Sequence, residues 1–433
     1  MIYLENNELL AKFLDYLGLP LQEDLQWSFL DYLTGLILED QPSINKIAKN
    51  TIGGMNERRL NRTLRKLRAV VNTIFQELLL KFQQVPQLAI KPTGVVALDE
   101  HIIPKTGDQI EGVDYFYAPA ERKTVLGLSL ISTHYFGGKI EYPLDRNLFR
   151  REQELQKWGM PADYLPKNEI ARILIRRFSA LNLPCKTWVM DCYFLTKENV
   201  KELHAHEMSY VAKIKRNWKC TYQKQHWTIR DLQASIPDAE YQQIEVMCAK
   251  TGAKRYFRVA SRDVFIKSIG NQLLVYAKEG EWNDAKEWVE KYPGQWICVV
   301  SDMCKKSAKA IIELYTQRWA IETSYRDENQ HLKLHGCMWR DIEGQYCFIT
   351  LVFIAYMFLC WAKNEGDLAS YNSDLTTLGA KCEAFKRYCN EHFAEWLVEL
   401  KQQCPQCEMA RFIYELIYKG DHPINLSRLK KRS

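Results

Sequence analysis

Residues 308–333 read AKAIIELYTQRWAIETSYRDENQHLK, and the rest of the chain can be arranged around this stretch. It contains no glycine or proline and is rich in helix formers, which predicts one continuous helix. Six of its residues recur at steps of three or four, which places them on one helix face. These residues are Tyr315, Arg318, Glu322, Arg326, Asn329 and Lys333. A carboxylate flanked by two arginines favours a charged ligand, although a solvated helix face would show the same pattern.

Two apolar stretches upstream each end in an aspartate. Residues 94–99 read GVVALD and residues 187–191 read TWVMD, so Asp99 and Asp191 are predicted to lie at the ends of buried strands. Further elements are predicted as strands at 115–117 and 124–135, a turn at Gly137-Gly138 and an amphipathic helix at 169–181. This order predicts a mixed α/β sheet flanked by helices, where sites are built at strand ends.

Three carboxylates in such positions suit one kind of chemistry. Asp99, Asp191 and Glu322 could hold two Mg²⁺ or Mn²⁺ ions about 4 Å apart, because these metals prefer hard oxygen ligands. Such a pair of ions clamps the attacking and leaving oxygens of a phosphoryl transfer. Each acid also has an ordinary interpretation: a strand-end turn residue, a helix N-cap, and an ion-pair partner of Arg318 or Arg326.

The chain resembles the DDE transposases of bacterial insertion sequences, in the group with a Tyr-x2-Arg-x3-Glu-x6-Lys signature. Tyr315, Arg318 and Glu322 match this signature with the same spacings. The segments around Asp99 (Ala-Leu-Asp-Glu) and Asp191 (Val-Met-Asp-Cys-Tyr) resemble the two aspartate blocks of the family. The resemblance covers residues 40 to about 365, and the glutamate block is its most specific part.

One signature residue differs. The position of the family lysine is Asn329 in this chain, whereas Lys333 lies one helical turn further on and Arg326 one turn before. Either basic residue could take over the phosphate contact of the lysine. The difference concerns the lysine and leaves the three acids in place.

The resemblance implies an RNase H-like catalytic domain interrupted by a β-rich insertion. It implies that Asp99, Asp191 and Glu322 bind two Mg²⁺ or Mn²⁺ ions, and that the enzyme cuts the terminal inverted repeats of its element and joins the 3′-OH ends to target DNA. Tyr315 and Arg318, helped by Arg326 or Lys333, would contact DNA phosphates, and the active form would be a homodimer on DNA. In some relatives an insertion tryptophan stacks on a flipped base. Five tryptophans are candidates here: Trp218, Trp227, Trp282, Trp288 and Trp296.

The N-terminal region is predicted to be helical and to bind DNA. Helices at 43–49 and 56–67, with Gly53-Gly54 between them, follow the pattern of a helix-turn-helix. Residues 44–81 contain nine Lys or Arg and two acids, which favours DNA binding over an ordinary helical bundle with a basic surface. The predicted DNA contacts are Arg58, Arg59, Arg62 and Arg65.

These features predict five segments along the chain. They are a helical DNA-binding region (1–88), the first part of the catalytic domain (89–212), a β-rich insertion (213–298), the second catalytic part with the glutamate helix (299–365), and a helical C-terminal region with a basic tail (366–433). The apolar run at 346–362 is barely long enough for a membrane span, and we expect a buried core helix and no membrane partner.

The thirteen cysteines and the start of the chain favour an intracellular protein. The resemblance implies the bacterial cytoplasm, with association to the nucleoid when the protein binds DNA. No signal peptide is recognisable, so we expect reduced and mostly buried thiols. Four cysteines near the C-terminus could form a structural zinc site or could be ordinary core and loop residues: Cys382, Cys389, Cys404 and Cys407.

Two other functions fit the same sequence. One is an RNase H-like, metal-dependent nuclease that cuts DNA without strand transfer. The other is a DNA-binding protein that descends from a transposase and has lost catalysis, which the presence of all three acids disfavours. An assay for joined DNA product separates the first alternative from a transposase.

Overall fold

The computed structural model describes residues 3–4, 7–18, 21–52, 56–118, 122–247, 252–282 and 287–403. Packing divides the chain into two compact units. The helical unit comprises Met1–Ala89, Lys105–Glu111 and Tyr325–Ser433, and the sheet unit comprises Ile90–Pro104 and Gly112–Ser324. The five segments predicted from the sequence were divided by expected function and not by packing, so their boundaries stay predictions.

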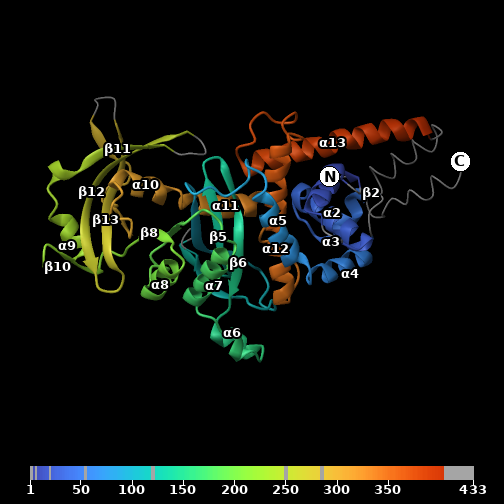
Figure 1. The fold of residues 1–433 in the computed structure, drawn as a ribbon. Coiled ribbons are helices and arrows are strands. Elements are labelled where there is room, and N and C mark those ends of the chain that lie inside the picture. The colour runs from blue at the N-terminus through green and yellow to red at the C-terminus, as the bar shows by residue number, and fades with distance from the viewer. Residues whose placement is uncertain are drawn as a thin grey trace. The chain divides into compact units, whose positions relative to one another are not determined.

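The helical unit is assembled around one apolar helix, α12 (Ile342–Glu365), which begins where the Asp341 side chain accepts the backbone N–H of Gly344. The other helices are α1 (Glu8–Leu17), α2 (Glu23–Leu38), α3 (Ile44–Asn50), α4 (Glu57–Leu67), α5 (Val71–Phe82) and α13 (Leu378–Gln403). Two short strands, β1 (Tyr3–Leu4) and β2 (Thr51–Ile52), pair in parallel. Helices α1, α2, α5 and α13 pack against α12, and Figure 1 shows α5 beside α12.

Helix α12 is long and apolar enough to cross a membrane, but 94% of its most apolar 18-residue window is buried inside the protein. Its side chains form the core of the helical unit. Phe353 packs on Phe75 of α5 with ring centroids 6.2 Å apart, and Phe358 packs on Phe13 of α1 at 5.2 Å. The prediction of a buried core helix is therefore confirmed.

The predicted helix-turn-helix corresponds to α3 and α4. Ser43 caps α3 and Asn56 caps α4, each by accepting a backbone N–H three residues further on. The two helices pack on each other and on α2. Gly53-Gly54, the predicted turn, lies outside the described residues, and the strand β2 intervenes between α3 and that turn.

The sheet unit contains one sheet of thirteen strands within the described part of the chain, in the order β10-β9-β12-β13-β15-β8-β7-β3-β5-β4, with β11, β14 and β6 as side branches. The predicted catalytic region supplies β3 (Val95–Pro104), β4 (Asp114–Ala118), β5 (Lys123–Gly137), β6 (Ile140–Phe149), β7 (Thr187–Met190) and β8 (Ser209–Lys213). Strands β3, β7 and β8 run parallel, and β3 pairs antiparallel with β5. Short α6 (Glu152–Lys157) precedes α7 (Lys167–Ala180), which packs on β5, β6 and α8 (Lys197–Ala205).

Strands from the predicted β-rich insertion extend this same sheet. They are β9 (Lys219–Tyr222), β10 (Gln225–Thr228), β11 (Gln242–Met247), β12 (Lys254–Ile266), β13 (Gly270–Trp282) and β14 (Trp288–Glu290), with α9 (Ile229–Ala234) between them. Strand β13 pairs with β15 (Ile297–Ser301), which in turn pairs with β8. In Figure 1 the long β12–β13 ribbon stands at one end of the sheet, and α10 (Ala308–Thr316) lies across it.

Two predictions about the elements were wrong. The stretch 308–333 is not one helix: α10 ends at Thr316, and α11 (Trp319–His331) begins after a turn at Gln317-Arg318. Asp99 does not end its strand, since β3 continues to Pro104. Both differences matter for the site, because they determine where Arg318 and Asp99 lie.

Candidate active site

Asp99 and Asp191 come from neighbouring parallel strands. The register pairs Leu98 of β3 with Met190 of β7, so the next residues along, Asp99 and Asp191, lie opposite each other. Neighbouring strands are about 4.8 Å apart, and residues in register point to the same face of a sheet. Asp191 directly follows β7, and it lies close enough to Asp99 to raise the pKa of that carboxyl.

Arg318 connects the third acid to this pair. Its guanidinium donates from Nη1 to Asp99 Oδ2 at 2.7 Å and from Nη2 to Glu322 Oε1 at 2.6 Å. The turn between α10 and α11 makes this possible, because it places Arg318 before the first residue of α11 with Glu322 one helical turn later. One buried arginine thus bridges acids from β3 and α11, and the structure brings together the three predicted acids and the predicted arginine.

Burial and neighbouring charges shift the pKa of Asp99 and of Arg318. Burial raises the pKa of Asp99 from 3.8 to about 7; Arg318 acts in the opposite direction, whereas Glu322 and Asp191 raise it further. Burial alone would lower the pKa of Arg318, but Asp99, Tyr315, Glu322 and Asp191 raise it above its ordinary value. A partly buried group of three acids with one arginine attracts cations.

Carboxylate oxygens are the donors that Mg²⁺ and Mn²⁺ prefer, so the residues present fit such ions chemically. Across the described parts of the chain, however, no three His, Cys, Asp or Glu side chains are gathered closely enough to surround one ion. Arg318 stands between Asp99 and Glu322 in the position of a counter-ion. The guanidinium occupies one oxygen of each carboxylate, so it competes with a metal ion for these two acids.

The other signature residues have different surroundings. Tyr315 on α10 is buried (3% exposed), and burial raises its pKa to about 12. Its ring lies under the Arg318 guanidinium, 5.8 Å from ring centroid to Cζ, so it supports that arginine. The side chain of Glu322, by contrast, is 55% exposed and faces solvent on one side.

The rest of the predicted polar row belongs to the helical unit. Arg326 is 71% exposed with a distant ion pair to Asp327, and Asn329 is partly buried. Lys333 lies beyond the end of α11 with a positive φ of 53°, and its ammonium donates to the Gln330 carbonyl. The predicted six-residue face of a single helix was therefore wrong, because the chain leaves the helix at both ends of the row.

Helix α4 presents the predicted DNA contacts to solvent. Arg58, Arg59, Arg62 and Arg65 are all exposed, whereas Leu60, Leu64 and other apolar residues face inward. The Glu57 carboxylate accepts a hydrogen bond from Asn45 of α3 at 2.6 Å, which ties the two helices together. The exposed face of α4 is thus strongly basic.

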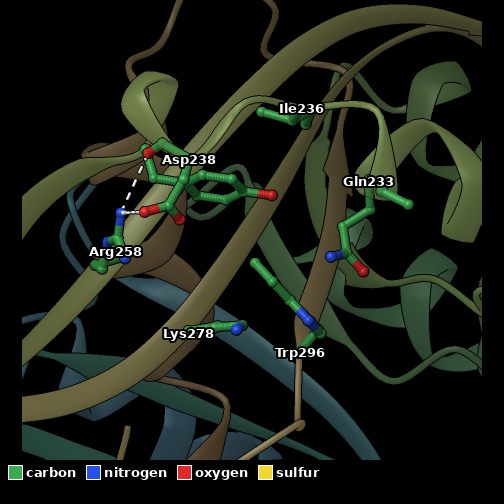
Figure 2. Close-up of a pocket in the computed structure, with 8 residues that line it drawn as sticks. Gln233, Ile236, Asp238, Arg258, Lys278 and Trp296 are labelled. Carbon is green, nitrogen blue, oxygen red and sulfur yellow. Dashed lines mark hydrogen bonds and ion pairs between the residues drawn. The ribbon is translucent and has the colours of Figure 1, made fainter. Parts of the chain in front are cut away.

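A cavity of about 170 Å³ lies in the part of the sheet unit predicted as the insertion (Figure 2). Among the five candidate tryptophans, Trp296 lines it, with Tyr241 5.4 Å away and the Lys278 ammonium 4.3 Å above its ring. Trp282 and Trp288 pack on each other instead. Figure 2 also shows Arg258 paired with Asp238 at the cavity wall.

Sequence reasoning missed one contact next to the site. Arg255 of β12 stacks on Trp319, the residue after Arg318, with its Cζ 3.9 Å from the ring centroid. No local sequence signal joins residues that are 64 positions apart. The only available signal was that Trp319 follows Arg318 in the chain.

The predicted zinc site is unresolved. Cys382 and Cys389 are buried on α13, and Cys404 and Cys407 lie outside the described residues, as does the basic tail at 428–432.

Comparisons with known proteins give two family matches. A family described as "Transposase DDE domain" matches residues 168–358, and one described as "DDE superfamily endonuclease" matches residues 16–238. No curated protein matches the chain. Among solved structures, the NurA nuclease from Sulfolobus solfataricus aligns over 70% of this chain and 96% of its own, at 10% identity and a TM-score of 0.22, which is too low to support an argument.

Proposed function

Because the chain belongs to the DDE transposases, a group of endonucleases that act on DNA, we propose that it moves its own insertion sequence. In this proposal the enzyme binds the terminal inverted repeats, cuts the DNA there and joins the freed 3′-OH ends to target DNA. DDE nucleases generally use divalent metal ions, and we propose two Mg²⁺ or Mn²⁺ ions here.

One observation carries the proposal: a single arginine bridges an acid of β3 to an acid of α11 while the second aspartate lies beside the first. Residues that are 223 positions apart in the chain, Asp99 and Glu322, contact the same guanidinium. An ordinary surface ion pair needs only one acid. Glu322 and Asp191 both raise the pKa of Asp99, so gathering these acids costs free energy, and a cation-dependent site accounts for that cost.

We assign roles to the side chains from their positions. Asp99, Asp191 and Glu322 would hold the metal ions, which would activate the attacking oxygen and offset charge on the phosphate. Arg318 would move from the carboxylates to a phosphate oxygen when DNA binds, since a guanidinium suits both partners. Tyr315 would support Arg318 before DNA binds, and Arg326 or Lys333 would supply the contact of the signature lysine.

The basic face of α4 supports a proposed role in binding the terminal repeats. Arg58, Arg59, Arg62 and Arg65 are exposed along it, and phosphate contacts by such residues fix the position of a protein on DNA. We further propose that the protein acts as a homodimer on DNA and works in the bacterial cytoplasm at the nucleoid.

Isosteric variants test the acids. Purified protein should nick DNA that carries the terminal repeats only with Mg²⁺ or Mn²⁺, and Asp99→Asn, Asp191→Asn and Glu322→Gln should each reduce nicking at least ~100-fold. Glu313→Gln is the matched control, since Glu313 lies on α10 and pairs with Lys309 at 3.8 Å, away from the three acids. Nicking that survives any of the three substitutions would refute the assignment of that acid.

The strand-joining step is tested separately. Pre-cut terminal repeats with a free 3′-OH are incubated with circular target DNA, and joined product is measured. Joined product supports a transposase. Metal-dependent nicking without any joined product would support an endonuclease activity and would refute the proposed strand-transfer step.

A further inference from the structure

Arg255 is held in one orientation by the Glu279 carboxylate in the sheet unit. Its Nε and Nη2 donate to both oxygens of Glu279 on β13, at 3.0 and 2.5 Å. The Glu279 side chain is only 5% exposed and also pairs with Lys291 at 3.3 Å. Burial would raise its pKa, but these two cations hold the pKa of Glu279 below its ordinary value. A bidentate pair of this kind fixes the plane of the guanidinium.

The flat face of this guanidinium covers Trp319. The distance of 3.9 Å between Arg255 Cζ and the ring centroid is well within the range of a cation–π contact. Trp319 also meets Tyr315, edge to face, with ring centroids 6.3 Å apart. Trp319, the half-buried first residue of α11, therefore contacts both β12 and α10.

The joint between α10 and α11 is spanned by four backbone hydrogen bonds between residues three apart. The Gln317 and Arg318 N–H groups donate to the Leu314 and Tyr315 carbonyls, and the Ala320 and Ile321 N–H groups donate to the Gln317 and Arg318 carbonyls. Helix α10 packs on β11, β12 and β13. At the start of α11, the buried Ile321 side chain and the contacts of Trp319 hold the chain. The direction of α11 sets where Glu322 lies, and the joint sets where Arg318 lies.

We propose that Arg255 is a positioning residue for the reaction: by clamping Trp319 it holds Arg318 and Glu322 at the distances that the site needs. The inference rests on the proposed function and deepens it. The β12–β13 ribbon would then fix the geometry of the active site through the stacked pair Arg255–Trp319. Arg255 itself touches neither DNA nor metal in this role.

Kinetics test the clamp with three variants and a control. Arg255→Ala and Trp319→Leu should lower kcat for nicking about 10- to 100-fold, because small displacements of catalytic groups are costly, while KM for DNA stays within about twofold. Arg255→Lys, which keeps the charge but cannot form the two-point pair with Glu279, should restore part of kcat. Lys254→Ala is the control: the neighbouring lysine is exposed and pairs with Glu245 at 3.2 Å.

A double-mutant cycle shows whether Arg255 acts through Trp319. The variant with both substitutions should be no slower than Trp319→Leu alone, because Arg255 has no indole left to clamp once Trp319 is replaced. Independent, multiplying effects on kcat would overturn the clamp, as would an Arg255→Ala variant with the kcat of Lys254→Ala.

Hydrogen exchange tests the inference without catalysis. In Arg255→Ala the amides of residues 319–324 should exchange about 10-fold faster than in the unsubstituted protein, while those of β3 keep their rates. Unchanged exchange at 319–324 would overturn the inference, and accelerated exchange everywhere would show general unfolding instead of a local role. If the unsubstituted protein cuts no DNA with any metal, the proposed function fails, and exchange still decides the role of Arg255.

Discussion

At the scale of single residues, Arg318 occupies the place of a cation in the site, and this leads to a prediction about metal binding. Its guanidinium competes with a metal for Asp99 and Glu322. Arg318→Gln should therefore bind Mn²⁺ about tenfold more tightly at pH 8.5, where the acids are ionised, and yet cut DNA more slowly. Isothermal titration with Mn²⁺ gives the affinity.

Two comparisons make the Arg318 experiment decisive. Arg318→Lys keeps a positive charge and should bind Mn²⁺ with nearly the affinity of the unsubstituted protein. Glu322→Gln should weaken binding, which locates the ion at this site. Equal or weaker binding by Arg318→Gln at pH 8.5 would contradict the counter-ion role.

His134 of β5 gives a prediction about acid stability. Burial lowers its pKa from 6.5 to about 3, and His101 lowers it further. In the folded protein it stays neutral down to about pH 3, whereas the unfolded chain takes up a proton near pH 6.5. The contribution of His134 to the free energy of unfolding is therefore unchanged above pH 6.5. This contribution falls as the pH drops from 6.5 toward 3, because the unfolded chain binds the proton and the folded protein does not.

The expected effect can be isolated by substitution. Between pH 7.5 and 5, His134→Phe should lose about 2 kcal/mol less unfolding free energy than the unsubstituted protein, because one titrating group has been removed. Phenylalanine can keep the stacking on Phe136, whose ring centroid is 6.3 Å away. Urea unfolding at both pH values measures this difference. An identical loss in both proteins would show that His134 does not govern it.

At the scale of elements, α4 gives a prediction about DNA binding. Reversing the charge of Arg58, Arg62 and Arg65 to glutamate should weaken binding and lower the slope of log K against log salt by roughly 0.9 for each phosphate that is no longer neutralised. Lys12→Glu on α1 is the control, since that lysine is 62% exposed and pairs with Asp367 at 3.8 Å. Fluorescence anisotropy across a salt series measures the slope. If the triple variant keeps the original slope, α4 does not carry the phosphate contacts.

Elements with a strong local pattern could be read from the sequence, and their junctions could not. The strands at 115–117, 124–135 and 187–190 and the helix at 169–181 are all present as β4, β5, β7 and α7. The break at Gln317-Arg318 was missed because neither residue disfavours a helix; tertiary contacts of Trp319 and Arg318 override local propensity there. The strand β6 was missed although apolar residues alternate with others from Ile140 to Leu144, with Pro143 inside the run. The continuation of β3 past Asp99 depends on pairing with β5.

The candidate site shows the same division. Residue types and spacings were enough to select Asp99, Asp191, Glu322 and Arg318, because each sits in a recognisable block. What the sequence could not give was which of them touch: Arg318 binds acids 219 positions before it and 4 positions after it. Such contacts depend on sheet register and on the bend between two helices, and neither is encoded in a local window.

At the scale of the whole molecule, the helical unit is assembled from both ends of the chain, which predicts how the DNA-binding region will behave alone. Residues 1–89 contribute α1, α2 and α5, whose apolar faces pack on α12. Phe13 meets both Phe358 and Trp361, at 5.2 and 5.3 Å, and Phe75 meets Phe353. An isolated 1–89 segment would expose these rings to water, at a cost of ~1.5–3 kcal/mol for each large side chain.

We therefore expect residues 1–89 alone to lack a cooperative unfolding transition, although sequence reasoning treats 1–88 as a separate region. Joining 1–89 to 325–403 through a flexible linker restores α12 and α13 and should restore a sharp thermal transition by circular dichroism. The comparison decides between two views of the molecule. If 1–89 unfolds cooperatively by itself at the temperature of the linked chain, then α12 is not the core that these helices need, and the basic face of α4 belongs to an independent domain.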